Sequence, residues 1–587
     1  MGGSTDTVPI KGQVLIGASK NILLLGLFIL ALSLKLFIFF FISSPVIFSK
    51  YPYFADKINR GMDIGERLLD LSPFYLYGMT LLQKLYGPNW EAMVIFQILT
   101  GSLTVLVIFL IGEKLFRRSV GLLAAVLLIF YGNLTLFELT LEPDSFILFF
   151  NALLVLCLLW AVEGSPSHYN GITWFLSGLL LGLSIITKAN GLLIIPGILF
   201  WIWWTGSGKK HRLKAMGLFL LGTTLLVLPV TARNVLKFSD PVLITADMGK
   251  VFFHGNGPGA TGMERADLPD QGFIEESGGE PDYAHVLFRD KARTLTRQNL
   301  KPSESSRFWI LRTLEYMKAQ PFYGLDLLLK KFFLFWQNYE VHDLDSTYAY
   351  YRTLRTWPLI PFGLISALGM LGLVLGWKNL KAVFLPFFMV MVYLITVIIF
   401  FNASRYRLPA VPFLALFAAH GFVLIMNRLK EKDTIQAFLL IGTVLVLFYL
   451  TEGLFKKETE VLNRWQQATR VHYNLRGNVS FKDGKFKEAI EEYKKALALA
   501  PGFAPAYNQM GRAYALLNDF SASEKSFQEV IKLSPMVDQG YLNLGLLYEL
   551  KGEKGKAFFF LKKALELNPN NVKAKAHLDR LILGRYP

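Results

Sequence analysis

Long apolar runs alternate with short charged stretches over about the first 450 residues of the chain. An apolar run of about 20 residues is long enough to cross the hydrocarbon core of a bilayer as a helix. Eleven runs approach this length, and we interpret them as spans at about 21–43, 91–112, 119–137, 145–162, 172–187, 190–204, 215–231, 357–376, 382–401, 408–426 and 435–451. The pattern therefore predicts an all-α polytopic membrane part over residues 21–452.

Positive charge in the short loops gives the predicted orientation of these spans. Lysine and arginine are in excess at EKLFRR (113–118), KKHRLK (209–214), WKNLK (377–381) and NRLKEK (427–432). Loops of this kind stay in the cytoplasm, and all four share a side only if residues 172–204 cross twice, with a break at TKAN. We therefore predict a cytoplasmic segment 1–20, external loops at about 44–90, 138–144 and 232–356, and a C-terminal part outside the cytoplasm.

Composition narrows the class of protein further. The 587 residues are 53% hydrophobic and carry a net charge of +17. In a soluble protein this charge would suggest nucleic acid, but the location of the charges matters more in a membrane protein, and we predict no nucleic-acid partner. The single cysteine, Cys157, excludes a disulfide framework, and no HExxH or similar cluster supports a metal or other cofactor. Segment 1–20 has no cleavage site, so we interpret the first apolar run as a signal anchor.

A repeat with a period of 34 residues begins near residue 470, where the hydropathy falls. The recurring positions are Tyr473, Tyr507 and Tyr541; Gly477, Gly511 and Gly545; Pro501, Pro535 and Pro569; and Ala489 and Ala557, with Ser523 between them. This is the tetratricopeptide pattern, in which small residues lie where two helices touch and proline closes each unit. We predict a linker helix at 453–469, units near 471–504, 505–538 and 539–572, and a capping helix at 573–583. Such a stack serves as a spacer or dimer contact, or it docks a protein partner.

Ionisable residues collect at the predicted external ends of the apolar helices, where functional sites of membrane proteins lie. Carboxylates lie on the first two external segments: Asp56, Asp63, Glu66, Asp70, Glu142 and Asp144. Cations lie at the later helix ends: Lys188, Arg233, Arg405 and Arg407. This combination suits transfer of a group from an anionic lipid carrier, because a carboxylate can deprotonate the acceptor hydroxyl while cations stabilise the leaving phosphate. The structural alternative is that the acids are solvated or cap helices and the arginines contact headgroups.

The segment SRYRLPAVPF, residues 404–413, carries two arginines one residue apart. Pro409 favours extended backbone at Leu408, and side chains two residues apart in an extended segment share a face. We therefore expect Arg405 and Arg407 to bind phosphate together, because guanidinium groups make bidentate contacts to phosphate oxygens. We expect Tyr406 to pack between helices. The glycine-rich HGNGPGATG lacks the ending of a phosphate loop and is interpreted as a flexible turn.

Five stretches between residue 20 and about residue 452 carry a family resemblance. They are the acidic first loop with SPFYLYGMTLLQKLYG, then LEPDSFILFF, LSIITKANGLLIIPG, TARNVLKFSDPVLIT with GNGPGATG, and SRYRLPAVPFLALFAA, which is the most specific. Together they resemble the GT-C glycosyltransferases, and most closely the bacterial branch of protein O-mannosyltransferases and the aminoarabinose transferase of lipid A. The resemblance implies a polyprenyl- or dolichyl-phosphate sugar as donor, an active site on the extracytoplasmic face, and a place in the bacterial inner membrane.

The charges and the resemblance together give the candidate residues their expected roles. The donor phosphate is expected at Arg405, Arg407, Tyr406, Lys188 and Arg233. We expect Asp70 to be the base, with Asp56 second, and Glu142 and Asp144 to position the acceptor or the base. The family usually places its acid early in the first loop, often as an acidic pair, whereas SSPVIFSKYPYF has no acid before Asp56. The sugar stays open, as does the acceptor, which could be a protein, a lipid or a glycan.

Two other functions fit the same sequence. One is a polysaccharide polymerase or ligase that uses a diphosphate-linked glycan, and the other is a non-catalytic membrane anchor that displays the repeats as a scaffold. A transporter is disfavoured, because the two halves of the membrane part show no matching pair of broken helices.

Overall fold

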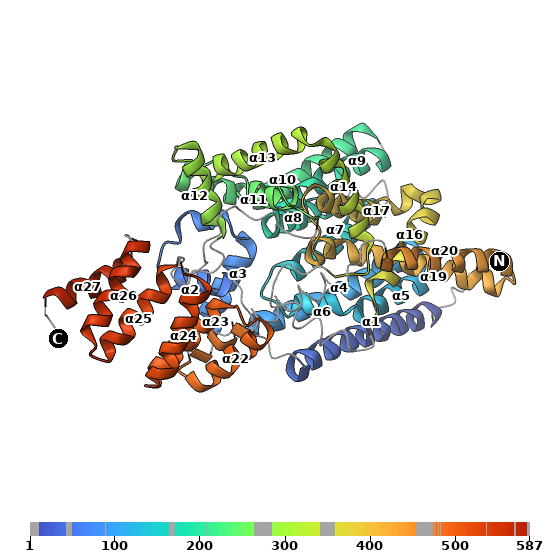
Figure 1. The fold of residues 1–587 in the computed structure, drawn as a ribbon. Coiled ribbons are helices and arrows are strands. Elements are labelled where there is room, and N and C mark those ends of the chain that lie inside the picture. The colour runs from blue at the N-terminus through green and yellow to red at the C-terminus, as the bar shows by residue number, and fades with distance from the viewer. Residues whose placement is uncertain are drawn as a thin grey trace, which may run out of the picture. The chain divides into compact units, whose positions relative to one another are not determined.

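A computed structural model describes residues 11–42, 50–87, 90–163, 171–206, 208–262, 284–340, 359–453 and 473–583, apart from 475, 479, 482, 536, 569 and 570. Every regular element within these ranges is a helix, which confirms the predicted all-α fold (Figure 1). The chain divides into two compact units, one formed by residues 1–343 and 353–456, the other by residues 344–352 and 457–587. Each unit is described by itself.

The first unit is built around long apolar helices. They are α1 (Lys11–Phe37), α4 (Glu91–Leu115), α7 (Asp144–Glu163), α10 (Lys209–Phe238), α16 (Phe362–Gly376), α17 (Leu380–Ile399), α19 (Val411–Lys430) and α20 (Thr434–Gly453). Within the described residues, seven helical runs are long and apolar enough to cross a membrane. There are eight if α5 (Arg118–Ile129) and α6 (Gly132–Glu138), which are bent by 59°, form one broken span.

The expected count of eleven differs from this number for identifiable reasons. Helix α8 (Gly171–Thr187), followed by the short helix η3 (Ala189–Leu193) and α9 (Ile194–Thr205), matches the predicted spans 172–187 and 190–204, but α8 and α9 fall below spanning length. The break between them comes at Lys188, as predicted. The run Phe362–Ile399 counts once, although a straight helix of its length would separate its ends by about 57 Å.

Contacts at both ends show that this run reverses direction. The N–H of Gly363, at the start of α16, donates to Asn338 Oδ1 at 2.7 Å. Just beyond the end of α17, the carbonyl of Phe400 accepts from Lys331 Nζ at 2.5 Å. Both partners belong to residues 331–338, so the chain turns back at η5 (Trp377–Asn379), and α16 and α17 run in opposite directions.

Small residues allow close helix packing in the membrane part, as between α8 and α10. A Cβ built on Gly178 of α8 would lie 2.0 Å from the carbonyl oxygen of Phe219 in α10. One built on Gly222 of α10 would lie 2.3 Å from the carbonyl oxygen of Phe175. The two backbones therefore approach at distances that no larger residue permits, as is typical of membrane helices.

The two long loops predicted to be external are themselves helical. The first contains α2 (Lys50–Asn59), the short η2 (Gly65–Leu69) and α3 (Pro73–Tyr86); the second contains α11 (Met248–Asn256), α12 (Ala284–Thr296), α13 (Pro302–Ala319) and α14 (Pro321–Trp336). Helices α11 to α14 share a small apolar core around Phe253, Phe288 and Trp309. The indole N–H of Trp309 donates to the carbonyl of Phe288 at 2.9 Å, which ties α13 to α12.

The second unit is a stack of antiparallel helix pairs. Its bounded helices are α22 (Phe486–Leu499), α23 (Ala504–Leu516), α24 (Phe520–Leu533), α25 (Asp538–Leu550), α26 (Lys554–Leu567) and α27 (Val572–Leu583). The 34-residue period has a packing cause, because a Cβ on Gly511 would lie 2.6 Å from the ring of Phe527, and one on Gly545 would lie 2.7 Å from Leu561. The expected contributions of Pro569 and of 454–469 in the linker helix lie outside the described residues.

Candidate active site

The turn between α6 and α7 holds two of the predicted site residues, Glu142 and Asp144. Gln97 of α4 fixes this turn, because its Nε2 donates to the carbonyls of Glu138 at 2.8 Å and Thr140 at 2.6 Å. Asp144 is the first residue of α7, where the free N–H groups of a helix start favour a negative charge. Both carboxylates are therefore held on one well-anchored corner.

Two predicted cations pair with these acids. Lys188, in extended backbone between α8 and η3, forms an ion pair with Asp144, and Arg405 Nη1 lies 3.5 Å from Glu142 Oε2. The ring of Tyr406 lies 5.4 Å from the Lys188 ammonium and 5.3 Å from the Arg405 guanidinium, so it faces both cations. We call these five residues the charged cluster.

The charged cluster can exchange its internal ion pairs for contacts to a substrate. A phosphate group at Lys188 and Arg405 would accept the charge-assisted hydrogen bonds that the two carboxylates accept here. The buried Oδ2 of Asp144 has no hydrogen-bond partner in the described part of the chain, so one acceptor atom is already open. Within that same part, no three His, Cys, Asp or Glu residues form a group that could hold a metal ion.

The first predicted external loop reaches this region at its Ser-Pro corner. Ser72 caps α3, and its Oγ donates to the carbonyl of Ile186, which lies near the end of α8, at 3.4 Å. The N–H of Ser72 donates to the hydroxyl of Tyr51 at 3.2 Å. Burial raises the pKa of Tyr51 well above its ordinary value, and the charge of Glu142 raises it further. The corner that follows Asp70 therefore lies beside the segment that carries Lys188.

Asp70 itself is buried in an ion-pair network. Its Oδ2 accepts from Arg67 Nη1 at 2.9 Å and from Arg289 Nη2. Arg289 also donates to Glu66 at 3.0 Å, and Arg293 lies 3.4 Å from the same oxygen. Although burial lowers the pKa of Arg289, Asp70 and Glu66 raise it above the ordinary value. Asp70 thus ties η2 to α12, and no sequence pattern pointed to its partner Arg289, which is 219 positions away.

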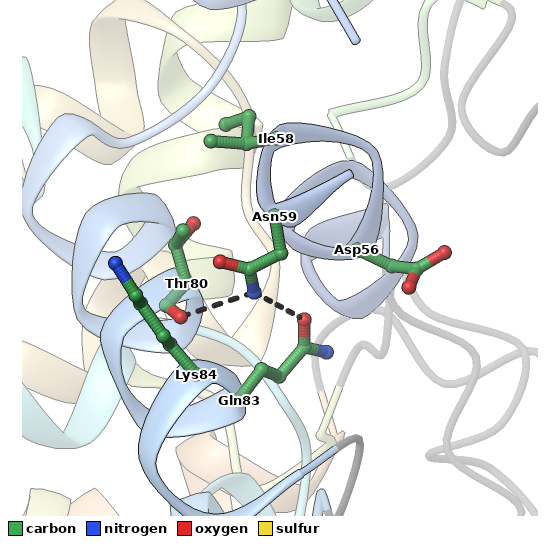
Figure 2. A pocket seen from close by; sticks show the side chains of 6 residues that line it. All are labelled: Asp56, Ile58, Asn59, Thr80, Gln83 and Lys84. Atoms are coloured by element: carbon green, nitrogen blue, oxygen red, sulfur yellow. Dashed lines mark hydrogen bonds between the residues drawn. The ribbon is translucent and has the colours of Figure 1, made fainter. Parts of the chain in front are cut away.

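Asp56, the second expected base, lies on α2 and forms an exposed ion pair with Arg60 at 3.0 Å. It borders a pocket of about 430 Å³ lined by Asp56, Ile58, Asn59, Thr80, Gln83 and Lys84. Asn59 Nδ2 donates across this pocket to the carbonyl of Thr80 at 3.1 Å, whereas the carboxylate of Asp56 points away from Asn59 (Figure 2). No described contact joins Asp56 to the charged cluster.

Arg233 also lies outside the charged cluster. It extends from α10 towards the first loop, where its Nη1 donates to the hydroxyl of Tyr77 at 2.9 Å. Its Nη2 donates to Asn234 Oδ1 at 2.7 Å and to the carbonyl of Leu68 at 3.5 Å. The contacts of Arg233 in this structure are therefore with η2 and α3, next to the Asp70 network.

The prediction that Arg405 and Arg407 share one face is wrong. Residues Ser404–Arg407 form one helical turn, α18, and Leu408 continues it with helical dihedral angles (φ −51°, ψ −40°) in spite of Pro409. Side chains two positions apart on a helix point to different sides. Arg405 faces Glu142, whereas Arg407 points into the protein.

Arg407 is enclosed by residues 334–340. Its Nη1 donates to the carbonyls of Gln337 at 2.7 Å and Phe335 at 3.1 Å, and its Nη2 donates to Glu340 Oε2 at 2.6 Å. The guanidinium lies 3.7 Å from the ring centroid of Phe362, and Arg407 is 1% exposed. In this structure Arg407 is an anchor of residues 334–340, because its Nη1 and Nη2 atoms both donate to protein oxygens.

A buried ion pair that the sequence reading missed supports the acidic turn. Lys35 of α1 and Glu138 of α6 are both at most 1% exposed, and Lys35 Nζ lies 2.7 Å from Glu138 Oε1. Each charge interrupts an apolar stretch, and an ionisable residue inside such a stretch is itself a signal of a functional or structural site. The pair fixes α1 to the helix that ends four residues before Glu142.

Comparison with known sequences places the two parts of the chain in classes. Residues 70–234 match the family described as dolichyl-phosphate-mannose-protein mannosyltransferase. Residues 477–518, 504–535 and 538–571 match tetratricopeptide repeat families. The resemblance inferred from the sequence is thereby confirmed over residues 70–234, and the predicted repeats are confirmed as well. The matched region contains Asp70, Glu142, Asp144, Lys188 and Arg233, but neither Asp56 nor Arg405.

Individual relatives match only parts of the chain. Human protein O-mannosyl-transferase TMTC2 is 34% identical over 105 residues, which cover 17% of this chain and 12% of that protein. The wheat (Triticum aestivum) Hsp70-Hsp90 organizing protein is 31% identical over 103 residues, 18% of each chain. The chain therefore spans less than a fifth of the length of these relatives. An archaeal oligosaccharyltransferase structure from Archaeoglobus fulgidus matches at 10% identity and a TM-score of 0.43, over 80% of this chain and 59% of that one.

Proposed function

We propose that the chain is an integral-membrane glycosyltransferase that moves a sugar from a polyprenyl-phosphate donor to an acceptor hydroxyl or amine on the extracytoplasmic face. The observation that carries this proposal is the charged cluster, in which two cations and two carboxylates meet at helix ends of the mannosyltransferase-family region and of α18. A lipid-phosphate sugar would present its phosphate at the level of such helix ends, while its tail stays among the acyl chains.

The cations of the cluster have a defined part in this reaction. Lys188 and Arg405 exchange Asp144 and Glu142 for the donor phosphate and stabilise the negative charge that it gains. The acceptor oxygen forms a bond to the anomeric carbon of the sugar, and the bond from that carbon to the phosphate oxygen breaks. The electron pair leaves with the phosphate, which needs no proton, so a single carboxylate that takes the acceptor proton is sufficient.

The contacts favour Glu142 as that carboxylate, with Asp70 as the competing candidate. Glu142 faces the phosphate-binding Arg405 at 3.5 Å, a distance longer than a good charge-assisted hydrogen bond. Asp70 shares one oxygen between Arg67 and Arg289, so its charge is engaged in holding η2 and α12 together. A carboxylate in that position would have to leave two guanidinium groups before it could accept a proton.

Isosteric variants separate the candidates. We expect Glu142→Gln to reduce turnover by about 10²- to 10⁴-fold while donor binding stays nearly intact, because only the proton transfer is lost. Asp56→Asn is the matched control and should turn over normally. If Asp70→Asn abolishes turnover with intact binding and Glu142→Gln does not, the base is Asp70. Normal turnover in all three variants would reject the catalytic proposal and favour a scaffold.

A donor panel distinguishes this reaction from its nearest alternative. The purified protein is incubated with polyprenyl-phosphate sugars and, separately, with diphosphate-linked glycans, and transfer to added acceptors is measured. Transfer from the monophosphate donors alone supports the proposal. Transfer from the diphosphate donors alone would identify a polysaccharide polymerase or ligase instead.

The proposed side of the membrane follows from the number of spans and the basic loops. A reporter fused after Tyr586 that is active only in the cytoplasm should stay silent. Cytoplasmic activity would reject the eleven-span arrangement and place the cluster on the wrong side. The repeats, on this arrangement, are proposed to dock the acceptor or a partner protein beside the outer surface of the membrane.

A further inference from the structure

Helix α14 has an outward face that is mostly apolar, with Asp326 and Lys330 along one side of it. Five large apolar side chains between 38% and 87% exposed form this face, which we call the α14 stripe: Phe322, Leu325, Leu329, Phe332 and Phe333. They recur at three- and four-residue spacing, so they lie on one side of the helix. The opposite side is buried in the protein through Leu327, Lys331 and Leu334. A contiguous apolar face of this kind marks a surface that something covers.

The length of the stripe excludes a membrane crossing. Residues 322–333 extend over about 17 Å at 1.5 Å per residue, whereas the hydrocarbon core of a bilayer is about 30 Å thick. Helix α14 is also absent from the runs that are long and apolar enough to cross. The stripe can therefore lie along a membrane but cannot pass through it.

The buried side of α14 attaches it to crossing helices at their ends. Lys331 Nζ donates to Asn256 Oδ1 at 2.7 Å and to the carbonyls of Ile398 and Phe400 at the end of α17, at 3.4 and 2.5 Å. The carbonyl of Trp336, the last residue of α14, accepts from Ser366 Oγ of α16 at 2.8 Å. The helix therefore lies where α17 ends and α16 begins, which is the level of a membrane surface.

Helix α17, which contacts α14, also exposes apolar side chains near its end. Near the end of α17, Ile395 is 50% exposed and Ile399 is 38% exposed. On α14, Lys330 pairs with Asp326 at 2.6 Å beside the stripe, and Lys318 near the end of α13 is exposed. An apolar stripe with charged residues on the neighbouring side fits a lipid leaflet, because the acyl chains cover the stripe and the headgroup layer solvates the charges.

We propose that α14 is a membrane-surface helix whose stripe is inserted among the acyl chains of the leaflet next to the charged cluster. Arg407 donates to the carbonyls of Phe335 and Gln337 at the end of α14, and Arg405 lies on the same turn as Arg407. The depth of α14 in the leaflet thereby sets the depth of Arg405. This consequence rests on the proposed function, in which Arg405 meets a phosphate at headgroup level.

A cysteine scan in lipid vesicles tests the insertion without any assay of activity. In a Cys157→Ser background, single cysteines replace residues 322–333 of the full chain, except the buried Gly324, Leu327 and Lys331, and carry a small fluorophore. The protein is reconstituted in phosphatidylcholine and phosphatidylglycerol vesicles with brominated acyl chains. We expect strong quenching by the lipid at 322, 325, 329 and 333, and weaker quenching at 326 and 330, where soluble iodide quenches instead.

Two outcomes would overturn the proposal. Quenching of the stripe positions by iodide and not by brominated lipid would place the stripe in water. Protection from both quenchers would show that protein covers it, either the repeats or a second copy, and energy transfer between differently labelled copies would identify the second copy. Equal quenching at all scanned positions would remove the helical pattern on which the proposal depends.

A second measurement links insertion to the site. The variant Leu325→Lys with Leu329→Lys should lower turnover of a long-chain polyprenyl-phosphate donor in vesicles by several-fold, and Asp326→Lys is the matched control. Lipid quenching at Phe333→Cys should fall in the double variant alone. If quenching is lost but turnover is unchanged, α14 is still a membrane-surface helix, but the idea that its depth sets the depth of Arg405 is rejected. If Arg405→Ala also leaves turnover unchanged, it is the proposed function that fails.

Discussion

Arg405 and Arg407 occupy one helical turn and have opposite surroundings. Arg405 is 17% exposed and reaches Glu142 at 3.5 Å, beside Lys188 and Tyr406. Arg407 is 1% exposed and donates to carbonyls of residues 334–339 and to Glu340. The same type of side chain therefore reaches a carboxylate at 3.5 Å at one position, and at the other it donates to buried protein oxygens, three of them at 2.6–3.1 Å.

The difference shows how the protein holds a site that must change partners. The carboxylate of Glu340 accepts hydrogen bonds from the guanidinium of Arg407, from the hydroxyl of Tyr131 at 2.6 Å and from the amide of Asn133 at 2.9 Å. It therefore joins α18 to the start of α6. Helix α6 leads into the turn that carries Glu142. The buried network thus fixes the two segments that carry Arg405 and Glu142. Such support of a functional group by buried neighbours is what preorganisation requires.

The largest expected effect is on stability and concerns the buried Arg407. Arg407→Ala should lower the free energy of unfolding by about 3–5 kcal/mol, because it leaves Glu340 buried without its cation. Arg407→Lys should restore only part, since an ammonium cannot reach the carbonyls and the carboxylate in the same fork geometry. Denaturant titration in detergent micelles measures both variants.

A matched control for Arg407 is the exposed pair of Arg428 and Glu431, which are 2.9 Å apart. Arg428→Ala removes the same side chain from a solvated place and should cost less than about 1 kcal/mol. A similar loss in the two alanine variants would mean that the Arg407 network does not stabilise the fold, and the contrast with Arg405 would disappear.

The second effect is on function and should leave stability almost unchanged. Arg405→Ala should reduce use of a polyprenyl-phosphate donor by about 10- to 100-fold, which corresponds to the loss of one charge-assisted contact of about 1.5–3 kcal/mol. Arg405→Lys should recover part of it. Steady-state kinetics with varied donor concentration give the effect. If Arg405→Ala has the donor kinetics of the wild type, Arg405 does not bind the donor phosphate, and its role is ordinary contact with lipid headgroups.

The fold was predictable where it depends on local periodicity. Apolar runs gave the helices of the membrane part, the break at Lys188 came where the basic loops required it, and the 34-residue spacing of small residues gave the repeats. The number of spans was less accessible at α8 and α9, because length and apolarity alone do not separate them from buried half-helices. The basic loop WKNLK, in contrast, correctly divided Phe362–Ile399 into two helices.

The site was predictable only in its choice of charged residues. Lys188, Arg405, Glu142 and Asp144 come together as helix-end charges were expected to do. Which charges pair depends on contacts across hundreds of residues, and Arg289 beside Asp70 shows no local pattern. The face of Arg407 was misjudged because the restriction that Pro409 places on Leu408 is a preference, and the buried acceptors around Arg407 favour a helical turn.

The smallest expected effect is on the stability of the repeats, where a partly solvated carboxylate, Glu524, forms an ion pair. Glu524 of α24 accepts from the hydroxyl of Tyr548 at 2.7 Å and pairs with Lys551 at 3.1 Å. The hydrogen bond from Tyr548, and then Lys551, lower the pKa of Glu524 below its ordinary 4.5. The stabilisation from this group is therefore complete at pH values above 4.5 and is lost as the pH falls through the lower pKa of the folded state.

Glu524→Gln should accordingly weaken local stability by about 0.2–1 kcal/mol at neutral pH, and the difference from the wild type should shrink as the pH falls below 4.5. Hydrogen exchange of the α24 and α25 amides in the full chain reports this stability helix by helix. Glu529→Gln is the control, because Glu529 pairs at 3.2 Å with Lys532, which is 73% exposed and lies on the same helix. Glu529→Gln should change the amide hydrogen exchange of α24 and α25 less than Glu524→Gln does. If Glu524→Gln destabilises the repeats as much as Arg407→Ala destabilises the membrane part, burial is not what separates the two kinds of ion pair, and the contrast between Arg405 and Arg407 needs another cause.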